Sequence, residues 1–192
     1  ADEAMNVAGD TGENNRVRAE AQRARGMALL SIGETQPAFE QLSEAHAAFQ
    51  SIGDTTSAAR LLLEIGMARR RLGQLDEAEF AYTEALGLLE ATGNLAWQAN
   101  LLNNLGVLQQ ERGDYLVAAR SLERSVEMAR LARYPRVEAF ALAGLGDLYR
   151  DLEAYTAATE AYRQAGALAG RIGEAYLVFY LDLSRGILVR RQ

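Results

Sequence analysis

The stretch that decides the fold is residues 101–130, LLNNLGVLQQERGDYLVAARSLERSVEMAR. Apolar residues recur in it at three- and four-residue steps on both sides of Gly113, which predicts two helices joined by a turn. Gly106 lies inside the first of these helices, where glycine costs about 1 kcal/mol relative to alanine. A cost of this size indicates that packing requires a residue without a side chain at that position.

The same pattern returns every 40 residues along the chain. We call a set of residues at equivalent positions of successive repeats a column. A glycine column has five members, and each of the first four glycines is followed, at fixed distances, by an alanine, then a leucine or tyrosine, and then a small residue. The columns are Gly26, Gly66, Gly106, Gly146 and Gly186; Ala38, Ala78, Ala118 and Ala158; Leu42, Tyr82, Leu122 and Tyr162; and Ala45, Ala85, Ser125 and Ala165. A fixed period of this size is the signature of a repeat array.

Each period predicts a hairpin of two helices of about 17 residues, so the fold class is an all-α solenoid of antiparallel hairpins. We expect the glycine and alanine columns to let the paired backbones approach closely. Glu153 and Arg133-Tyr134-Pro135 stand where other repeats have glycine at a helix end. The glycines predicted to end helices in the left-handed conformation are Gly33, Gly53, Gly73, Gly93, Gly113 and Gly173.

The array extends over the whole chain, so we expect a single solenoid domain over residues 1–192. Residues 1–13 read as the tail of a preceding helix, and residues 174–192 as a half repeat. These two ends indicate a piece of a longer protein. The complete repeats are expected at about 17–53, 54–93, 94–133 and 134–173.

The columns resemble those of the tetratricopeptide repeat, which has small residues at three motif positions and an aromatic residue or leucine at a fourth. This resemblance covers about residues 17–192 and implies a right-handed superhelix that binds partners. The period of 40 rather than 34 resembles the sensor domains of MalT-like and antibiotic-regulator-like bacterial transcription regulators. It implies a protein- or ligand-binding sensor for signal transduction; the alternative is a constitutive scaffold for protein assembly.

Composition agrees with a cytoplasmic, non-enzymatic binding protein. A net charge of −6 argues against direct binding of nucleic acid, because phosphate binding needs a basic face. The chain has no cysteine and no apolar run long enough to suggest a membrane span. All 20 basic residues are arginine, which we interpret as the codon bias of a bacterial genome.

In tetratricopeptide arrays the first helices line a concave groove, and the resemblance implies which residues face it here. We expect this surface to bind a protein or peptide, an acidic one included, or a small effector. The residues are Arg23, Met27, Arg60, Met67, Arg70, Asn100, Asn103, Gln110, Phe140, Asp147, Arg150 and Tyr180. Arg70, Arg150 and Arg190 share one column, which predicts either a basic stripe for a carboxylate or internal pairs with neighbouring acids.

No catalytic, cofactor or metal site is predicted. His46 is the only histidine and has no cysteine to help it hold a metal, so we interpret it as a partly exposed helix residue. Acidic pairs such as Asp76-Glu77 read as solvated first-turn residues. The apolar helix at residues 174–191 predicts a homodimer that covers its exposed side.

Overall fold

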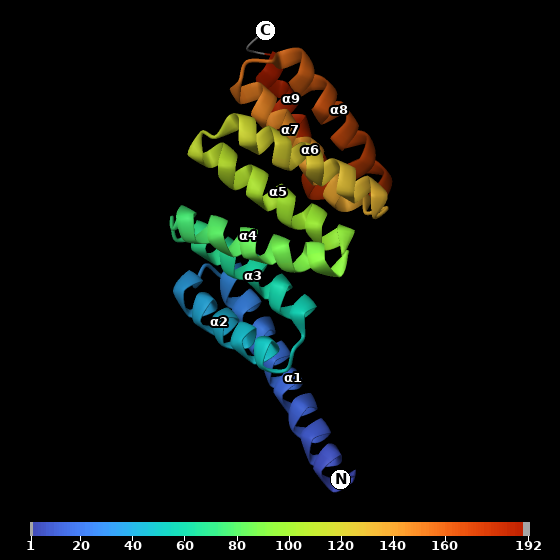
Figure 1. Cartoon of the computed structure of the whole chain (residues 1–192). Helices are drawn as coiled ribbons and strands as arrows, with labels where there is room; N and C mark the ends of the chain where they lie inside the picture. The colour runs from blue at the N-terminus through green and yellow to red at the C-terminus, as the bar shows by residue number, and fades with distance from the viewer. Residues whose placement is uncertain (1, 190–192) are drawn as a thin grey trace. The chain divides into compact units, whose positions relative to one another are not determined.

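The computed structural model describes the backbone of residues 2–189 and the side chains of residues 13–188 (Figure 1). Over this range the chain forms nine α-helices and no β-strand, which confirms the all-α class. The helices are α1 (Asp2–Ser31), α2 (Thr35–Ser51), α3 (Thr55–Arg71), α4 (Leu75–Thr92), α5 (Leu95–Arg112), α6 (Tyr115–Leu131), α7 (Pro135–Asp151), α8 (Tyr155–Ile172) and α9 (Ala175–Val189).

The helices group into two compact units, unit 1 (Ala1–Thr92) and unit 2 (Gly93–Gln192). Unit 1 contains α1 to α4 and unit 2 contains α5 to α9, and within each unit every helix contacts the next one along the chain. Each unit has a buried core of its own, with Leu42 and Phe49 in unit 1 and Leu122, Tyr162 and Leu181 in unit 2.

Each unit presents two different faces. The first helices of neighbouring hairpins contact each other, α1 with α3 in unit 1, and α5 with α7 and α7 with α9 in unit 2. Together they form what we call the first-helix face. The second helices form the second-helix face, and among the described residues no close backbone contact joins α2 to α4 or α6 to α8. Space for a groove therefore remains between the second helices.

The turns between helices have the backbone geometry predicted from their glycines. All six glycines expected at helix ends have φ between 68° and 87°. Arg133 and Glu153, which stand where glycine is missing, also take positive φ, at 51° and 57°. The C-terminus of α5 is capped at Gly113. The Asp114 N–H donates a hydrogen bond to the Gln109 carbonyl at 2.9 Å, so the last carbonyls of α5 keep partners.

The glycine column has a different neighbour from the one expected. A Cβ on Gly106 would lie 2.5 Å from Cγ of Leu122, a side chain of the larger column, and 3.3 Å from the carbonyl oxygen of Ala118. A Cβ on Gly146 would collide with the ring of Tyr162. The backbones do come close, but the missing side chain mainly makes room for the leucine or tyrosine sixteen residues later.

The first helix is longer than the sequence indicates. Residues 2–31 form one continuous helix, so no helix end separates the predicted tail at residues 1–13 from the first repeat. This stretch contains no proline, the residue that most strongly interrupts a helix. Among the described residues, no helix is both long enough and apolar enough to cross a membrane.

Candidate functional site

On the first-helix face of unit 1, the predicted Arg23 is engaged within the unit. Its Nε donates to both carboxylate oxygens of Glu64 at 3.0 and 3.1 Å, and its Nη2 donates to Oε1 at 2.6 Å. Glu64 lies on α3 and is only 6% exposed. Burial raises the pKa of Glu64, while the hydrogen bonds from Arg23 and the charge of Arg60 oppose this shift. Arg23 therefore ties α1 to α3.

The other predicted residues of this face lie on α1 and α3 and are half-buried. Met27 packs against the core of unit 1. Arg60 lies near Glu64, and Met67 and Arg70 lie on the following turns of α3. The structure thus places all five predicted residues of unit 1 on its two first helices.

On the first-helix face of unit 2, side chains from three helices meet at Asp147. Its Oδ1 accepts hydrogen bonds from the Tyr162 hydroxyl at 2.7 Å and from Nη1 of Arg150 at 2.8 Å. Its Oδ2 accepts a hydrogen bond from the Tyr180 hydroxyl at 2.6 Å. We call Asp147, Arg150, Tyr162 and Tyr180 the Asp147 cluster. It joins α7 to α8 and α9, so its geometry is fixed by three elements.

The two tyrosines of the Asp147 cluster remain hydrogen-bond donors over a wide pH range. Burial raises the pKa of both hydroxyls, and the Asp147 carboxylate that accepts their hydrogen bonds raises it further. The pKa of Tyr180 reaches about 12. At neutral pH both hydroxyls are therefore protonated and donate to Asp147.

A hollow of about 260 Å³ lies beside the Asp147 cluster. Four predicted residues, Gln110, Asp147, Arg150 and Tyr180, meet in its lining. Gln110 crosses from α5 and donates from Nε2 to Oδ2 of Asp151 at 2.7 Å. The whole lining is Val107, Gln110, Glu111, Gly144, Asp147, Arg150, Asp151 and Tyr180.

Three predicted residues lie outside this hollow. Asn100 accepts hydrogen bonds from Nδ2 of Asn104 at its carbonyl and its side chain, at 2.9 and 3.3 Å. Asn103 is half-buried on α5. Phe140 packs against the core of unit 2, and the Arg136 guanidinium lies 5.4 Å from its ring centroid. Their shared column positions place them on the same face but not in the hollow.

The arginine column does not form a free basic stripe at Arg150. Besides Asp147, its guanidinium contacts Asp151 through Nη2 at 3.0 Å. Of the two alternatives for this column, internal pairing is the one found at Arg150. Arg70 is half-buried on α3, and Arg190 lies outside the described residues.

Two further hollows lie on the second-helix faces, where the sequence predicted no site. In unit 1, the α2–α4 groove has a volume of about 470 Å³. Its lining is Phe39, Ser43, Leu62, Ile65, Arg69, Asp76, Glu77, Phe80, Ala81 and Glu84.

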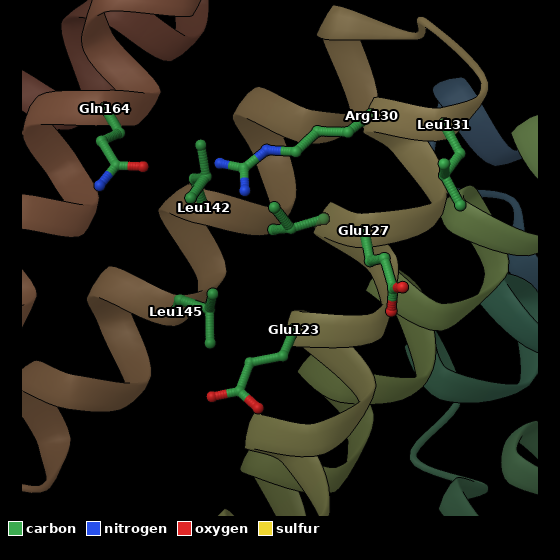
Figure 2. Close-up of a pocket in the computed structure, with 8 residues that line it drawn as sticks. Glu123, Glu127, Arg130, Leu131, Leu142, Leu145 and Gln164 are labelled. Carbon is green, nitrogen blue, oxygen red and sulfur yellow. The ribbon is translucent and has the colours of Figure 1, made fainter.

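The α6–α8 groove of unit 2 is the counterpart, with about 410 Å³. Figure 2 shows Leu142 and Leu145 of α7 between Gln164 of α8 and the α6 side chains Glu123 and Arg130. Val126, Glu127 and Leu131 complete its lining. Ser43, Leu62, Ile65 and Glu84 of the first groove correspond, two periods later, to Glu123, Leu142, Leu145 and Gln164 of the second.

A signal in the sequence could have found the α2–α4 groove. Phe80 occupies a column in which the other three repeats have Glu40, Arg120 and Glu160. An aromatic residue in a column of charged residues indicates a surface with a role other than solvation.

His46 lies on α2, half-buried, as the sequence predicted for a partly exposed helix residue. Burial lowers its pKa, and the charge of Glu84 on α4 opposes that shift. Within the part of the chain that the structure describes, no group of three or more histidine or acidic side chains is arranged to hold a metal ion.

Three solved structures have a similar fold. Aspartyl phosphate phosphatase F from Bacillus subtilis superposes with a TM-score of 0.85 at 12% identity, over 91% of this chain and 46% of that chain. The apo form of RapI superposes with a TM-score of 0.81 at 13% identity, over 89% of this chain and 62% of that chain. The third is a Signal Transduction ATPase with Numerous Domains from Pyrococcus horikoshii, which carries a tetratricopeptide repeat sensor. It superposes with a TM-score of 0.72 at 16% identity, over 84% of this chain and 25% of that chain.

These structures show the fold, and the chain spans less than two thirds of each of them. No curated protein sequence is significantly similar to the chain. Two family models, both described as "Tetratricopeptide repeat", match the sequence, one over residues 57–131 and the other over residues 141–169. Both ranges carry the glycine, alanine and leucine or tyrosine columns that pack the hairpins. The chain belongs to the tetratricopeptide repeat family.

Proposed function

We propose that the chain is the sensing part of a cytoplasmic bacterial transcription regulator, and that it binds a protein, peptide or small effector on the first-helix face of unit 2. The tetratricopeptide repeat is a protein-interaction fold. The observation that carries the proposal is the hollow in which Gln110, Asp147, Arg150 and Tyr180 meet. One structure of similar fold, that of the ATPase from Pyrococcus horikoshii, is described as having a tetratricopeptide repeat sensor.

The chemistry of the hollow defines the kind of partner it suits. Its lining carries three carboxylates, Glu111, Asp147 and Asp151, and one guanidinium, that of Arg150. Arg150 is already bonded to two of those carboxylates. An acidic peptide, which the arginine column had suggested, fits this lining less well than a segment that offers amide or hydroxyl groups. Such a segment would exchange hydrogen bonds with Gln110 and Tyr180 without placing a further charge beside Asp147.

Binding here would act on the packing of α9. The Tyr180 hydroxyl joins α9 to Asp147, so a ligand that replaces this hydrogen bond changes how α9 is held against α7. That link gives a sensor a route from the hollow to its last helix. The alternative function is a constitutive, non-enzymatic scaffold, in which partner binding leaves α9 unchanged.

The test is affinity capture from the source cell with the full chain as bait, compared with Gln110→Ala and Tyr180→Phe. We expect both variants to lose the captured partner while Gln164→Ala, on the second-helix face of the same unit, keeps it. A partner that both first-helix variants retain would contradict the proposal. Hydrogen exchange of α9 with and without the partner separates a sensor from a scaffold.

We also propose that two copies of the chain associate through α9. Its exposed side carries Tyr176, Phe179, Leu183 and Ile187 at helical spacing. Phe179 is 63% exposed, although it occupies the column in which the fully buried Ala59, Ala99 and Ala139 lie in earlier repeats. Sedimentation at micromolar concentration should give a dimer for the wild type and a monomer for Phe179→Ala. A wild-type monomer would contradict this arrangement.

A further inference from the structure

The α2–α4 groove of unit 1 exposes an aromatic residue where the repeat otherwise has a charged one. Phe80 is 71% exposed, and it lies in the groove opposite Phe39 of α2. Between them lie Leu62 and Ile65 of α3, both buried. The groove therefore has an apolar floor and two aromatic walls. An exposed apolar surface of this shape is typical of a site that another molecule covers.

The helices on both sides of this groove are acidic throughout. They carry seven carboxylates and no arginine or lysine, whereas α6 and α8 of unit 2 carry three carboxylates and five arginines. The seven are Glu40, Glu44, Asp76, Glu77, Glu79, Glu84 and Glu90. Asp76, Glu77 and Glu84 belong to the lining of the groove itself. The apolar centre is thus surrounded by negative charge.

One basic residue, Arg69 of α3, lines the groove and is held by unit 1. Its guanidinium lies 3.8 Å from the ring centroid of Phe39, within reach of a cation–π interaction. Its Nη1 also donates to Oε1 of Gln74 at 2.5 Å. Arg69 therefore braces the Phe39 wall, and the lining keeps a net negative charge.

We propose that the α2–α4 groove binds a segment of a partner protein that carries an apolar anchor flanked by lysine or arginine. The anchor would pack between Phe39 and Phe80 over Leu62 and Ile65. The flanking cations would lie against Asp76, Glu77 and Glu84, where charge complementarity favours the encounter and the register of the segment. This groove lies on the second-helix face of unit 1, whereas the hollow beside Asp147 lies on the first-helix face of unit 2.

The α6–α8 groove lacks both aromatic walls and serves as an internal reference. The position of Phe80 is taken by Glu160, and that of Phe39 by Ala119. Its lining includes Arg130, whose Nε bonds Oε1 of Glu138 at 2.7 Å, and Gln164 replaces Glu84. The same backbone groove in unit 2 therefore has no aromatic walls, and its lining carries two carboxylates and one arginine, against three carboxylates and one arginine in unit 1.

The test measures binding of a short synthetic amphipathic peptide of leucine and lysine to the full chain by fluorescence anisotropy. Phe80→Glu installs the residue that the fourth repeat has at this position, so the fold should tolerate it. We expect this variant to bind the leucine–lysine peptide at least about tenfold more weakly, because the anchor loses its aromatic wall. A peptide with glutamate in place of lysine should not bind the wild type.

The design separates anchoring from charge alone. Phe80→Glu adds a carboxylate, so purely electrostatic binding would become tighter in this variant. Leu116→Glu is the matched control, because Leu116 of α6 is 69% exposed on a second helix of unit 2. That control should leave the affinity unchanged or slightly higher. Equal or tighter binding to Phe80→Glu, or failure of the wild type to bind the leucine–lysine peptide, would overturn the proposal.

Discussion

Unit 1 and unit 2 are built from the same columns of small and large residues, yet they present different surfaces. On the second-helix face, unit 1 has a groove with aromatic walls between two acidic helices, whereas the groove of unit 2 has no aromatic residue in its lining and one carboxylate fewer. On the first-helix face, unit 1 holds a buried ion pair, whereas unit 2 has the Asp147 cluster beside a hollow. The comparison teaches that the repeated columns form the fold, and that departures from the repeat define the sites.

The largest expected effect concerns the ion pair that only unit 1 has. Two periods later, in unit 2, the equivalent positions hold Asn103 and Gly144, which cannot form an ion pair. Arg23→Ala leaves the buried Glu64 carboxylate without its main partner and should lower the free energy of unfolding by about 3 kcal/mol. Urea unfolding at neutral pH measures this change.

The control for this prediction is the double variant Arg23→Ala with Glu64→Gln, which removes the uncompensated charge. It should recover part of the lost stability. If the single and double variants were equally stable, the Glu64 carboxylate would cost no stability without Arg23. The contrast between the two first-helix faces would then be weaker than we infer.

A smaller effect tests what the two units share. Gly66→Ala in unit 1 and Gly146→Ala in unit 2 both place a methyl group against a buried tyrosine, so each should destabilise the protein by about 2 kcal/mol. Thermal or urea unfolding gives both values. A cost in one unit alone would show that the glycine column does not have the same packing role throughout.

Gly186 belongs to the same column but has no atom within 4 Å of where its Cβ would lie. Gly186→Ala should therefore stabilise the chain by about 1 kcal/mol, the ordinary gain in helix propensity. A loss of stability at Gly186 comparable to that at Gly146 would contradict the assignment of the cost to the tyrosine ring.

The sequence predicted the fold well because the columns repeat. Four hairpins share Gly26 and its equivalents, and the helix ends at Gly113 and Gly173 follow from glycine's access to positive φ. The continuous α1 was not foreseen, since residues 1–13 were interpreted as the tail of a separate, preceding helix. We expected the glycine column to face the alanine column, but it mainly faces the leucine or tyrosine column. These two columns are only one helical turn apart on the second helix.

The sites were harder to predict, because they depend on side chains that meet across helices. Motif positions brought Gln110, Asp147, Arg150 and Tyr180 to one face, and the structure brings them together in one hollow. The same reasoning placed Arg23 on the groove face without foreseeing its bonds to Glu64, and it left open whether Arg150 pairs internally, as it does with Asp147. Motif positions give the face of a helix and carry no information on which acid on a neighbouring helix lies within reach.

The most direct test of this account is hydrogen–deuterium exchange of the full chain with and without the leucine–lysine peptide. The α2–α4 and α6–α8 grooves are lined by residues at equivalent positions of the repeat. Hydrogen exchange of one sample therefore compares peptide protection at both grooves. We predict that the peptide slows exchange in α2 and α4 and leaves α6 and α8 unchanged, because only the α2–α4 groove combines aromatic walls with negative charge. Equal protection of both pairs of helices, or protection of α6 and α8 alone, would contradict the claim that departures from the repeat define the sites.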